Sequence, residues 1–498
     1  MGRQTRRTLL LGTGAVIGAF TANRLAPWHD TLDGVPLVGA APGDRLPATT
    51  LNDASLLSET PIAKHIVLTE DPGEALIARL RAELVEARAA GRPICLSAAR
   101  HSMGGQSLPR HGTALGWDNG RIEIDSAAQT YLTPGNARWS QIIAALDPAG
   151  LSPKVMQSNN DFGIAATFSA NAHGWPVPFG PMGSTVRSLT MMLPDGEVVT
   201  CSRTENADLF GMAMGGYGLI GLILTMQVEA VPNTRITPEF QRMPGRGLAD
   251  AFMAALDDPA IGMAYGRLSV DRADFMDQGL MIAYRPDADQ SDLPPATGSG
   301  WVSKAAAQIY RAQLYREPMK RLRWWTEASL NPRLGGTSTR NSLMNEPVLT
   351  LDDGDPTRTD ILHEYFVPSD RWSDFIAVCK EAIPSSYQEM LNVTIRYVAA
   401  DPDSWLAHSP TPRLAAVMSF SQEMSTRSEA DMARMTQQLI DGIATIGGSY
   451  YLPYRPHATV EQFARIYPRA AEFAAAKRAL DPSLTLRNAL WDNYLEPL

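Results

Sequence analysis

Three stretches rich in glycine and other small residues could gather backbone amides around one large anionic ligand. The first, residues 97–106, follows a short apolar segment and contains the adjacent glycines Gly104 and Gly105. The second covers residues 160–174, and the third covers residues 208–221. Turns built from small residues let several N–H groups point at a pyrophosphate. Unrelated surface turns are the alternative, but three such loops separated by strands predict a large ligand embedded in one domain.

The segments around these loops predict the elements that hold them. Residues 74–90 carry apolar side chains at helical spacing, and residues 139–146 predict a second helix. Short strands are expected at 93–96 and 122–124, and a hairpin over 189–200 around a Pro-Asp-Gly turn. This mixture predicts an α+β domain.

The sequence pattern changes after Pro232, where a second unit begins. Predicted strands alternate with predicted helices, as expected for an antiparallel sheet flanked by helices. The strands are expected at 362–367, 392–398 and 415–421, and the helices at 372–382 and 429–443. We therefore divide the chain into 1–40 (signal and tether), 41–230 (ligand-binding domain), 231–450 (substrate domain) and 451–498 (a closing segment that returns to the first domain).

Composition excludes some functions. The 498 residues carry a net charge of -9, which argues against a nucleic-acid surface, because such surfaces need a clustered basic face. The three cysteines, Cys95, Cys201 and Cys379, lack metal-ligand spacing, so no metal site is expected and buried apolar packing is the simpler interpretation.

The first twenty residues predict export. Arg6 and Arg7 precede a modestly apolar run, residues 11–20, that is too short to span a bilayer. This pattern resembles a twin-arginine signal, which directs folded proteins out of the cytoplasm. A periplasmic or other extracytoplasmic location is therefore expected. A retained signal-anchor and a buried amphipathic start are the alternatives, because no clean cleavage site follows residue 20.

A basic and aromatic segment at 310–325 has two interpretations. It carries Arg and Lys residues beside Tyr310, Tyr315, Trp324 and Trp325. Such a segment either lies on a membrane surface as a peripheral contact or forms a lid helix with its charges in water.

The three loops, in this order, resemble the FAD-binding (PCMH-type) domain of the vanillyl-alcohol-oxidase family. The matching motifs are His101-Ser102, the pair His173-Gly174, and the glycine-dense loop ending at Gly221. The C-terminal half is similar to alditol oxidases and aldonolactone oxidases, particularly around Arg396 and at Arg455-Pro456-His457. The resemblance implies an α+β fold in which a PCMH-type domain joins an antiparallel-sheet substrate domain flanked by helices.

The resemblance also implies which residues bind FAD, with His101 either bonded covalently to the flavin or only in contact with it. Two family glycines are replaced beside it, by Ala98 and Arg100, and Arg100 either contacts the pyrophosphate or displaces the backbone. Ala165 and Ala166 replace a further glycine pair, which is tolerable only where φ stays negative. The implied cofactor-binding residues are Arg100, His101, Ser102, Met103, Gly104, Gly105, Gln106, Asp161, Ile164, Ala165, Ser169, Asn171, His173, Gly174, Gly218, Gly221, Ile223 and Asn488.

On the substrate side, the resemblance implies Arg396 as the group that stabilises an alkoxide or holds a second polar group. Alditol oxidases place a glutamate two residues earlier, where this chain has Thr394, and a lysine where it has Val460. His457 is the leading candidate base, because imidazole is neutral near pH 7.

Three more residues complete the catalytic candidates: Tyr454, Arg455 and Glu364. Tyr454 would relay a proton only if Arg455 or Arg396 lowered its pKa, and packing between the domains is the alternative role. Glu364 and Tyr365 should face opposite sides of their strand.

The expected function is transfer of a hydride from a CH–OH group of a sugar, polyol, lactone or related alcohol to FAD. Oxygen, a quinone or a small electron carrier would then accept the electrons. One alternative is amine or C–N oxidation, which would need a carboxylate base such as Glu364 or Glu423. The other is an exported binding protein without redox turnover.

Overall fold

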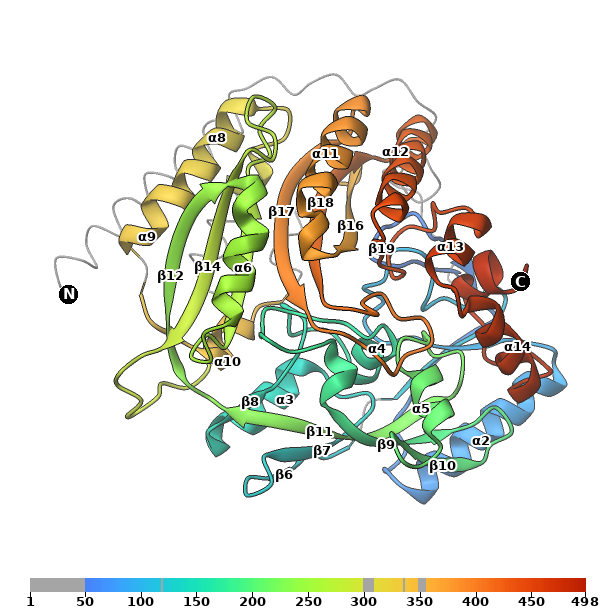
Figure 1. Cartoon of the computed structure of the whole chain (residues 1–498). Coiled ribbons are helices and arrows are strands. Elements are labelled where there is room, and N and C mark those ends of the chain that lie inside the picture. Colours follow the sequence, from blue (N-terminus) through green and yellow to red (C-terminus); the bar gives the residue numbers. More distant parts are fainter. Residues whose placement is uncertain (1–49, 118–119, 299–308, 335, 348–354) are drawn as a thin grey trace.

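The computed structural model describes residues 50–117, 120–298, 309–334, 336–347 and 355–498, and shows two lobes (Figure 1). One lobe contains two small sheets and the three predicted loops. The other contains one large antiparallel sheet with helices on it. The predicted signal and tether, residues 1–40, lie outside the described residues.

A three-stranded parallel sheet begins the first lobe. Its order is β3 (Lys64–Leu68), β5 (Thr113–Trp117) and β4 (Ile94–Leu96). Helix α2 (Glu74–Ala89) packs its leucines on this sheet, and Leu80 and Leu84 are fully buried. A two-stranded ribbon, β1 (Thr50–Leu51) with β2 (Thr60–Pro61), precedes it. The first predicted loop leaves the carboxyl end of β4.

A six-stranded sheet forms the rest of this lobe, and its strands carry the second and third loops. Its short helices are α3 (Trp139–Leu146), α4 (Ile164–Ser169) and α5 (Ala207–Ala213). The strand order is β10 (Val198–Ser202), β9 (Val186–Met192), β11 (Leu222–Pro232), β7 (Thr130–Pro134) and β6 (Glu123–Asp125), with β8 (Leu151–Pro153) also paired to β11.

An eight-stranded antiparallel sheet forms the second lobe. Helices α6 (Leu248–Leu256), α11 (Trp372–Ala382) and α12 (Thr426–Thr445) lie across one of its faces (Figure 1). The strand order is β15 (Ser338–Thr339), β12 (Arg235–Pro244), β14 (Gln278–Pro286), β13 (Met263–Leu268), β17 (Glu389–Val398), β18 (Arg413–Glu423), β16 (Arg358–Val367) and β19 (Ser449–Tyr450).

The opposite, inner face of this sheet is partly covered by the basic aromatic segment. There α8 (Glu317–Trp325) is followed by α9 (Asn331–Leu334) and α10 (Arg340–Met344). Lys320 is buried 2.9 Å from a carboxylate oxygen of Glu389, and Arg323 donates to Asn392. Lys320 and Arg323 therefore face the sheet, whereas the lid interpretation placed the charges of this segment in water. Within the described residues, no helix is both long and apolar enough to cross a membrane.

The predicted α+β fold is confirmed, and most predicted elements lie within two or three residues of their observed bounds. The sequence patterns did not identify β12, β13 and β14, where glycine and proline interrupt the alternation. Cys95, Cys201 and Cys379 are free and buried. In the part of the chain that the structure describes, no cluster of metal-ligating side chains occurs.

The closing segment connects the two lobes through α13 (Val460–Ile466) and α14 (Ala470–Leu480). After α14 the chain reaches β4, where Ile94 donates to the carbonyl of Thr485 at 2.6 Å. Buried Asp481 fixes this turn, since its carboxylate accepts from the backbone N–H groups of Thr485 and Leu486 and pairs with buried Lys477. Asp481 therefore anchors the C-terminus to the strand that carries the first loop.

Replacing Asp481 by Ala should lower the free energy of unfolding by about 3–5 kcal/mol, because Lys477 would remain as an uncompensated buried charge. Lys477→Met should cost less, because the Asp481 carboxylate would keep its two backbone donors. Urea unfolding of both variants measures the difference. Equal losses would contradict the anchoring role of Asp481.

The same pair predicts a pH dependence. Burial lowers the pKa of Lys477 to about 8, although Asp481 opposes the shift. Because an unfolded lysine has a pKa of about 10.4, the unfolded chain binds more protons between these values. The stability of the wild-type protein should therefore rise from pH 8 toward pH 10, and the Lys477→Met variant should lack this increment.

Candidate functional site

The first loop presents a row of unused backbone donors. Among the described residues, none accepts a hydrogen bond from the N–H groups of residues 98–102. The buried Ser97 hydroxyl beside them also lacks a partner. Consecutive free N–H groups next to a free hydroxyl form an anion-binding concavity. This is the arrangement that a pyrophosphate would satisfy.

The second loop lies directly against the first. A Cβ atom on Gly163 would be 3.5 Å from the Cβ of Ala98, which shows how closely the two backbones approach. His101 Nε2 lies 3.2 Å from an Asp161 carboxylate oxygen, and the His101 ring packs 4.4 Å from that of Phe162. The two loops therefore enclose His101 from two sides.

The third loop is hydrogen-bonded to α4, the short helix within the second stretch. Gly215 donates to the carbonyl of Phe168 at 3.1 Å, and Tyr217 donates to that of Ser169 at 2.9 Å. The side-chain amide of Asn488 donates to the Tyr217 carbonyl at 2.8 Å, so the closing segment also reaches this loop. Gly218 adopts a φ of +73°, and a side chain there would meet open space. The three loops are thus brought to one place.

The structure accommodates three of the residues that stand where the family has glycine. Arg100 has a φ of 54°, so this arginine adopts the left-handed conformation that glycine adopts without strain. Ala165 and Ala166 lie inside α4, where φ is negative, and their extra methyl groups are accommodated there.

Several residues predicted to bind cofactor use their side chains for protein contacts instead. Gln106 accepts from Gly104 N–H and donates to the carbonyls of Leu452 and Tyr454. Asn171 likewise accepts from Gly183 and donates to Asp401. These amides shape the loops, so any contact with a cofactor would come from their backbones.

The remaining predicted residues pack around the same loops. Gly174 admits no side chain, because a Cβ there would lie 1.9 Å from the carbonyl oxygen of Met156. Gly105 donates to Asp53, and the Ser102 hydroxyl contacts Ser107. The others are buried in the lobe or at its seam: Met103 against Leu362, Ile164 at the start of α4, Gly221 against Met191, and Ile223 in β11.

A buried carboxylate meets these loops from the second lobe. Glu364 on β16 contacts His173 Nε2 at 2.5 Å and accepts from the Tyr454 hydroxyl at 3.1 Å. Burial raises the pKa of Glu364, but the neighbouring His173 and Arg396 outweigh burial and hold it below its usual range. Glu364 is therefore ionised at neutral pH. Of these two neighbours on β16, Glu364 faces the loops and Tyr365 does not.

Arg396 lies beside this carboxylate on the same face of the sheet. Its guanidinium donates to the His173 carbonyl at 3.3 Å and to the Ser158 hydroxyl at 2.5 Å. Its Nε is buried without a hydrogen-bond partner among the described residues. Burial lowers the pKa of Arg396 and Glu364 opposes that shift. A cation with an unused donor therefore lies next to Glu364.

The structure places His457 elsewhere. Its ring nitrogens contact Glu429 at 2.8 Å and Thr436 at 3.3 Å, both on α12. Strand alternation puts neighbouring His363 on this same helix-covered face, whereas Glu364 points to the inner face. His457 thus stands apart from the cluster around Glu364, which contradicts its interpretation as the leading candidate base.

Tyr454 and Arg455 differ from expectation as well. Burial and the nearby Glu364 raise the pKa of Tyr454 well above its usual value, so the hydroxyl stays protonated and donates. The expected lowering by Arg396 is too weak to reverse this. Arg455 donates to the carbonyl of Met103 at 3.2 Å and pairs with Glu429. Arg455 therefore positions the first loop.

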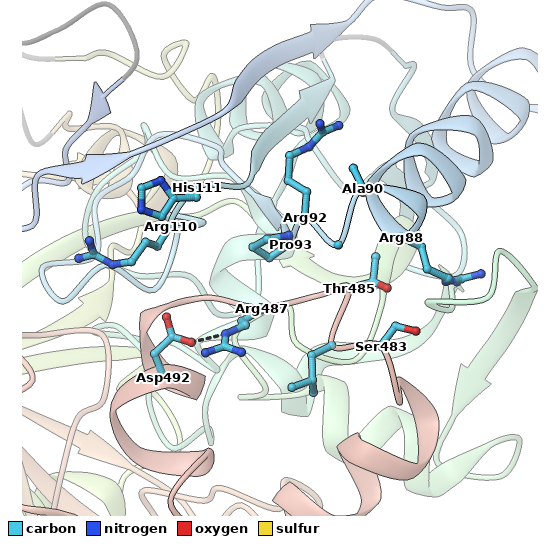
Figure 2. A pocket seen from close by; sticks show the side chains of 13 residues that line it. Arg88, Ala90, Arg92, Pro93, Arg110, His111, Ser483, Thr485, Arg487 and Asp492 are labelled. Atoms are coloured by element: carbon cyan, nitrogen blue, oxygen red, sulfur yellow. Dashed lines mark hydrogen bonds and ion pairs between the residues drawn. The ribbon is translucent and has the colours of Figure 1, made fainter.

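A separate cleft of about 490 Å³ lies between α2 and the closing segment. Figure 2 shows basic side chains around it, with the ion pair of Arg487 and Asp492. Pro93 in its wall precedes β4, whereas the first loop follows β4. The cleft contains none of the predicted site residues.

Comparison with known proteins agrees with this geometry. Residues 76–202 match the FAD binding domain family. The chain is 21% identical to an alditol oxidase of Streptomyces sp. over 412 residues, which cover 81% of this chain and 90% of that protein. It is 31% identical to cytokinin dehydrogenase 7 of rice over 147 residues, 28% of each chain. A putative D-arabinono-1,4-lactone oxidase of Neurospora crassa is 30% identical over 22% of this chain and 20% of its own.

The first four relatives, all cytokinin dehydrogenases, are matched over only 24–42% of their length. The free amides of residues 98–102 and the glycine at 218 fit the dinucleotide that this family binds. The chain therefore contains a PCMH-type FAD-binding domain, and FAD is its cofactor.

Proposed function

We propose that the protein oxidises a CH–OH group of a small substrate, passing its hydride to the bound flavin. The observation that carries the proposal is the ionised, buried Glu364, held between the two lobes by His173 and Tyr454. The match to an alditol oxidase over most of its length supports an alcohol as the donor. Bound FAD would supply the hydride acceptor, with oxygen, a quinone or a small carrier accepting the electrons afterwards.

The residues of this chain would act on the substrate hydroxyl as follows. Glu364 accepts the hydroxyl proton, since its carboxylate is ionised and already accepts from one hydroxyl, that of Tyr454. Arg396 stabilises the negative charge that develops on the oxygen. Burial of Glu364, which is 3% exposed, keeps water away and strengthens both effects.

Oxidation of a C–N bond is the second candidate function. Amine oxidation would need a carboxylate base, and Glu364 is a carboxylate in the right place to act as one. The similarity to cytokinin dehydrogenases points the same way. Against it, Arg396 would repel a protonated amine at this position. Glu423 is the other carboxylate considered. It lies 3.4 Å from Arg358, which is six residues before Glu364 on β16.

Glu364→Gln should slow hydride transfer by about 10²–10⁴-fold, because the amide cannot accept the hydroxyl proton. The measurement is bleaching of bound flavin, without oxygen, by a panel of polyols, sugar lactones and amines. Wild-type protein should be bleached by alcohols, and bleaching by amines alone would refute the proposal. No bleaching by any donor would favour the redox-inactive binding protein.

Two controls sharpen this test. Glu423→Gln, a matched carboxylate-to-amide change far from the site, should leave bleaching unchanged. The wild-type rate should decline only below the usual carboxylate range near pH 4.3, because the pKa of Glu364 is lowered. A rate that already declines near pH 6.5 would instead indicate a histidine base.

We propose further that His101 is bonded covalently to the flavin. Its Nε2 is buried without a hydrogen-bond partner of good geometry, close to Asp161. In acid-precipitated wild-type protein the flavin should stay with the pellet, whereas His101→Ala should release it. His65→Ala, a change at an exposed histidine of β3, is the matched control. Soluble flavin from wild-type protein would refute the bond.

Export by the twin-arginine route is proposed on the pattern at Arg6 and Arg7. Replacing both by Lys should leave the full-length flavoprotein in the cytoplasm after osmotic-shock fractionation, because the export receptor reads the arginine pair. Arg3→Lys should be exported normally. Equal distributions of the wild-type and double-variant proteins would contradict this route.

A further inference from the structure

Two arginines on the inner face of the large sheet make no direct ion pair with a carboxylate. Among the described residues, no carboxylate oxygen lies within ion-pair distance of Arg267 or Arg396. Arg267 donates to the hydroxyl of Thr394, and Arg396 donates only to a carbonyl and a serine hydroxyl. Half-buried guanidinium groups are normally paired directly, because burial of a charge away from water is costly. Arg396 and Arg267 lower the pKa of Glu364 and Glu327, but these carboxylates lie beyond ion-pair distance. Both guanidinium groups can therefore still bind a ligand carboxylate directly.

Strand register places both arginines in line with Glu364. Thr394 is directly opposite Arg267, and Thr394 and Glu364 flank the same residue of β18, Val417. Arg396 lies two residues along β17 from Thr394, on the same face. With strands about 4.8 Å apart, Arg267 lies about 14 Å from Glu364 across the sheet. The long side chains of Arg267 and Arg396 can extend over much of the distance to Glu364.

Arg267 is held in position by its surroundings. Its guanidinium lies 5.2 Å from the centre of the Tyr265 ring, which stacks on Trp175 of the other lobe at 4.7 Å. The opposite face of β13 is occupied by α6, since a Cβ on Gly266 would contact Leu248. The Arg267 side chain therefore lies on the face of β13 opposite α6, which is also the face of Thr394 and Arg396.

The carboxylates near these arginines are already engaged. Glu364 contacts His173 and Tyr454, and Glu327 pairs with Arg323 at 3.0 Å. The residue between the two arginines, Thr394, is neutral, and its hydroxyl also accepts from Asn392 at 3.2 Å. The inner face therefore has an excess of positive charge beside the candidate catalytic carboxylate.

We propose that the substrate of the reaction described above is a hydroxylated carboxylic acid. Arg267 and Arg396 bind its carboxylate, while its hydroxyl lies against Glu364. This inference rests on the proposed function and narrows its substrate class. Guanidinium groups match carboxylates in geometry and bind them through two parallel hydrogen bonds. A neutral polyol would leave Arg267 without a charged partner.

A binding experiment tests the anion site without turnover. Butyrate, valerate and hexanoate lack a hydroxyl and cannot be oxidised at one, and the change in flavin absorbance on titration reports their binding. The wild-type holoprotein should bind them and should not bind the corresponding amides. Arg267→Gln should weaken binding by about 10- to 150-fold, the range expected for hydrogen bonds to a charged group.

Two further variants keep the test decisive if Arg267→Gln is unstable. Thr394→Glu should also abolish carboxylate binding, because it would place an acid directly opposite Arg267. Arg285→Gln on neighbouring β14 removes an arginine that is already paired with Glu239 at 2.9 Å, and it should bind carboxylates normally. Thermal unfolding confirms that each variant is folded.

The outcomes separate the inference from the proposed function. Carboxylate binding that is lost in Arg267→Gln supports the anion site even if no alcohol bleaches the flavin. Bleaching by neutral polyols together with carboxylate binding that Arg267→Gln leaves unchanged would overturn the inference and leave the proposed function standing. Binding of inorganic phosphate in place of the carboxylates would also overturn it.

Discussion

The contact between the first loop and the closing segment determines the geometry of the whole site. Met103 donates to the carbonyl of Pro453 at 2.7 Å, and Gln106 donates to two further carbonyls of the same segment. Any side chain at Gly104 would collide with the Tyr454 carbonyl, since a Cβ there would lie 2.4 Å away. The second lobe can therefore lie directly on the first loop. Glycine at 104 is a condition for that approach.

Strand alternation on β16 determines which titratable side chain faces the first lobe. On β16, His363 points toward α12, where burial and nearby His457 lower its pKa to about 3. The next residue, Glu364, points to the inner face and meets the flavin-binding lobe. A shift of one residue in register would exchange these two groups. The chemistry available at the site therefore depends on the pairing of β16 with β18.

Sequence patterns predicted the fold well where periodicity was strong. The periodic patterns at 139–146 and 372–382 predict helices with the bounds that the structure has, and the small-residue loops are neighbours as their composition predicts. The site on the sheet was less predictable. Arg267 lies on β13, a strand whose alternation is interrupted by Gly266, and the sequence offers no sign that its partner is missing. The choice between His457 and Glu364 as the base depends on which face of the sheet each residue lies on. Patterns in a single sequence do not define that face.

The conformation of Arg100 shows how the loop tolerates an unusual residue. A non-glycine residue with a φ of 54° costs about 1–2 kcal/mol, and such strain persists only where surrounding contacts impose it. Here the carbonyls of Arg100 and Ser102 are both fixed, because they accept from the N–H of Ala54 at 3.0 Å and 3.2 Å. These bonds hold the carbonyls on one side and leave the N–H groups free on the other. The strained conformation of Arg100 therefore occurs in the same loop whose N–H groups are free to bind a pyrophosphate.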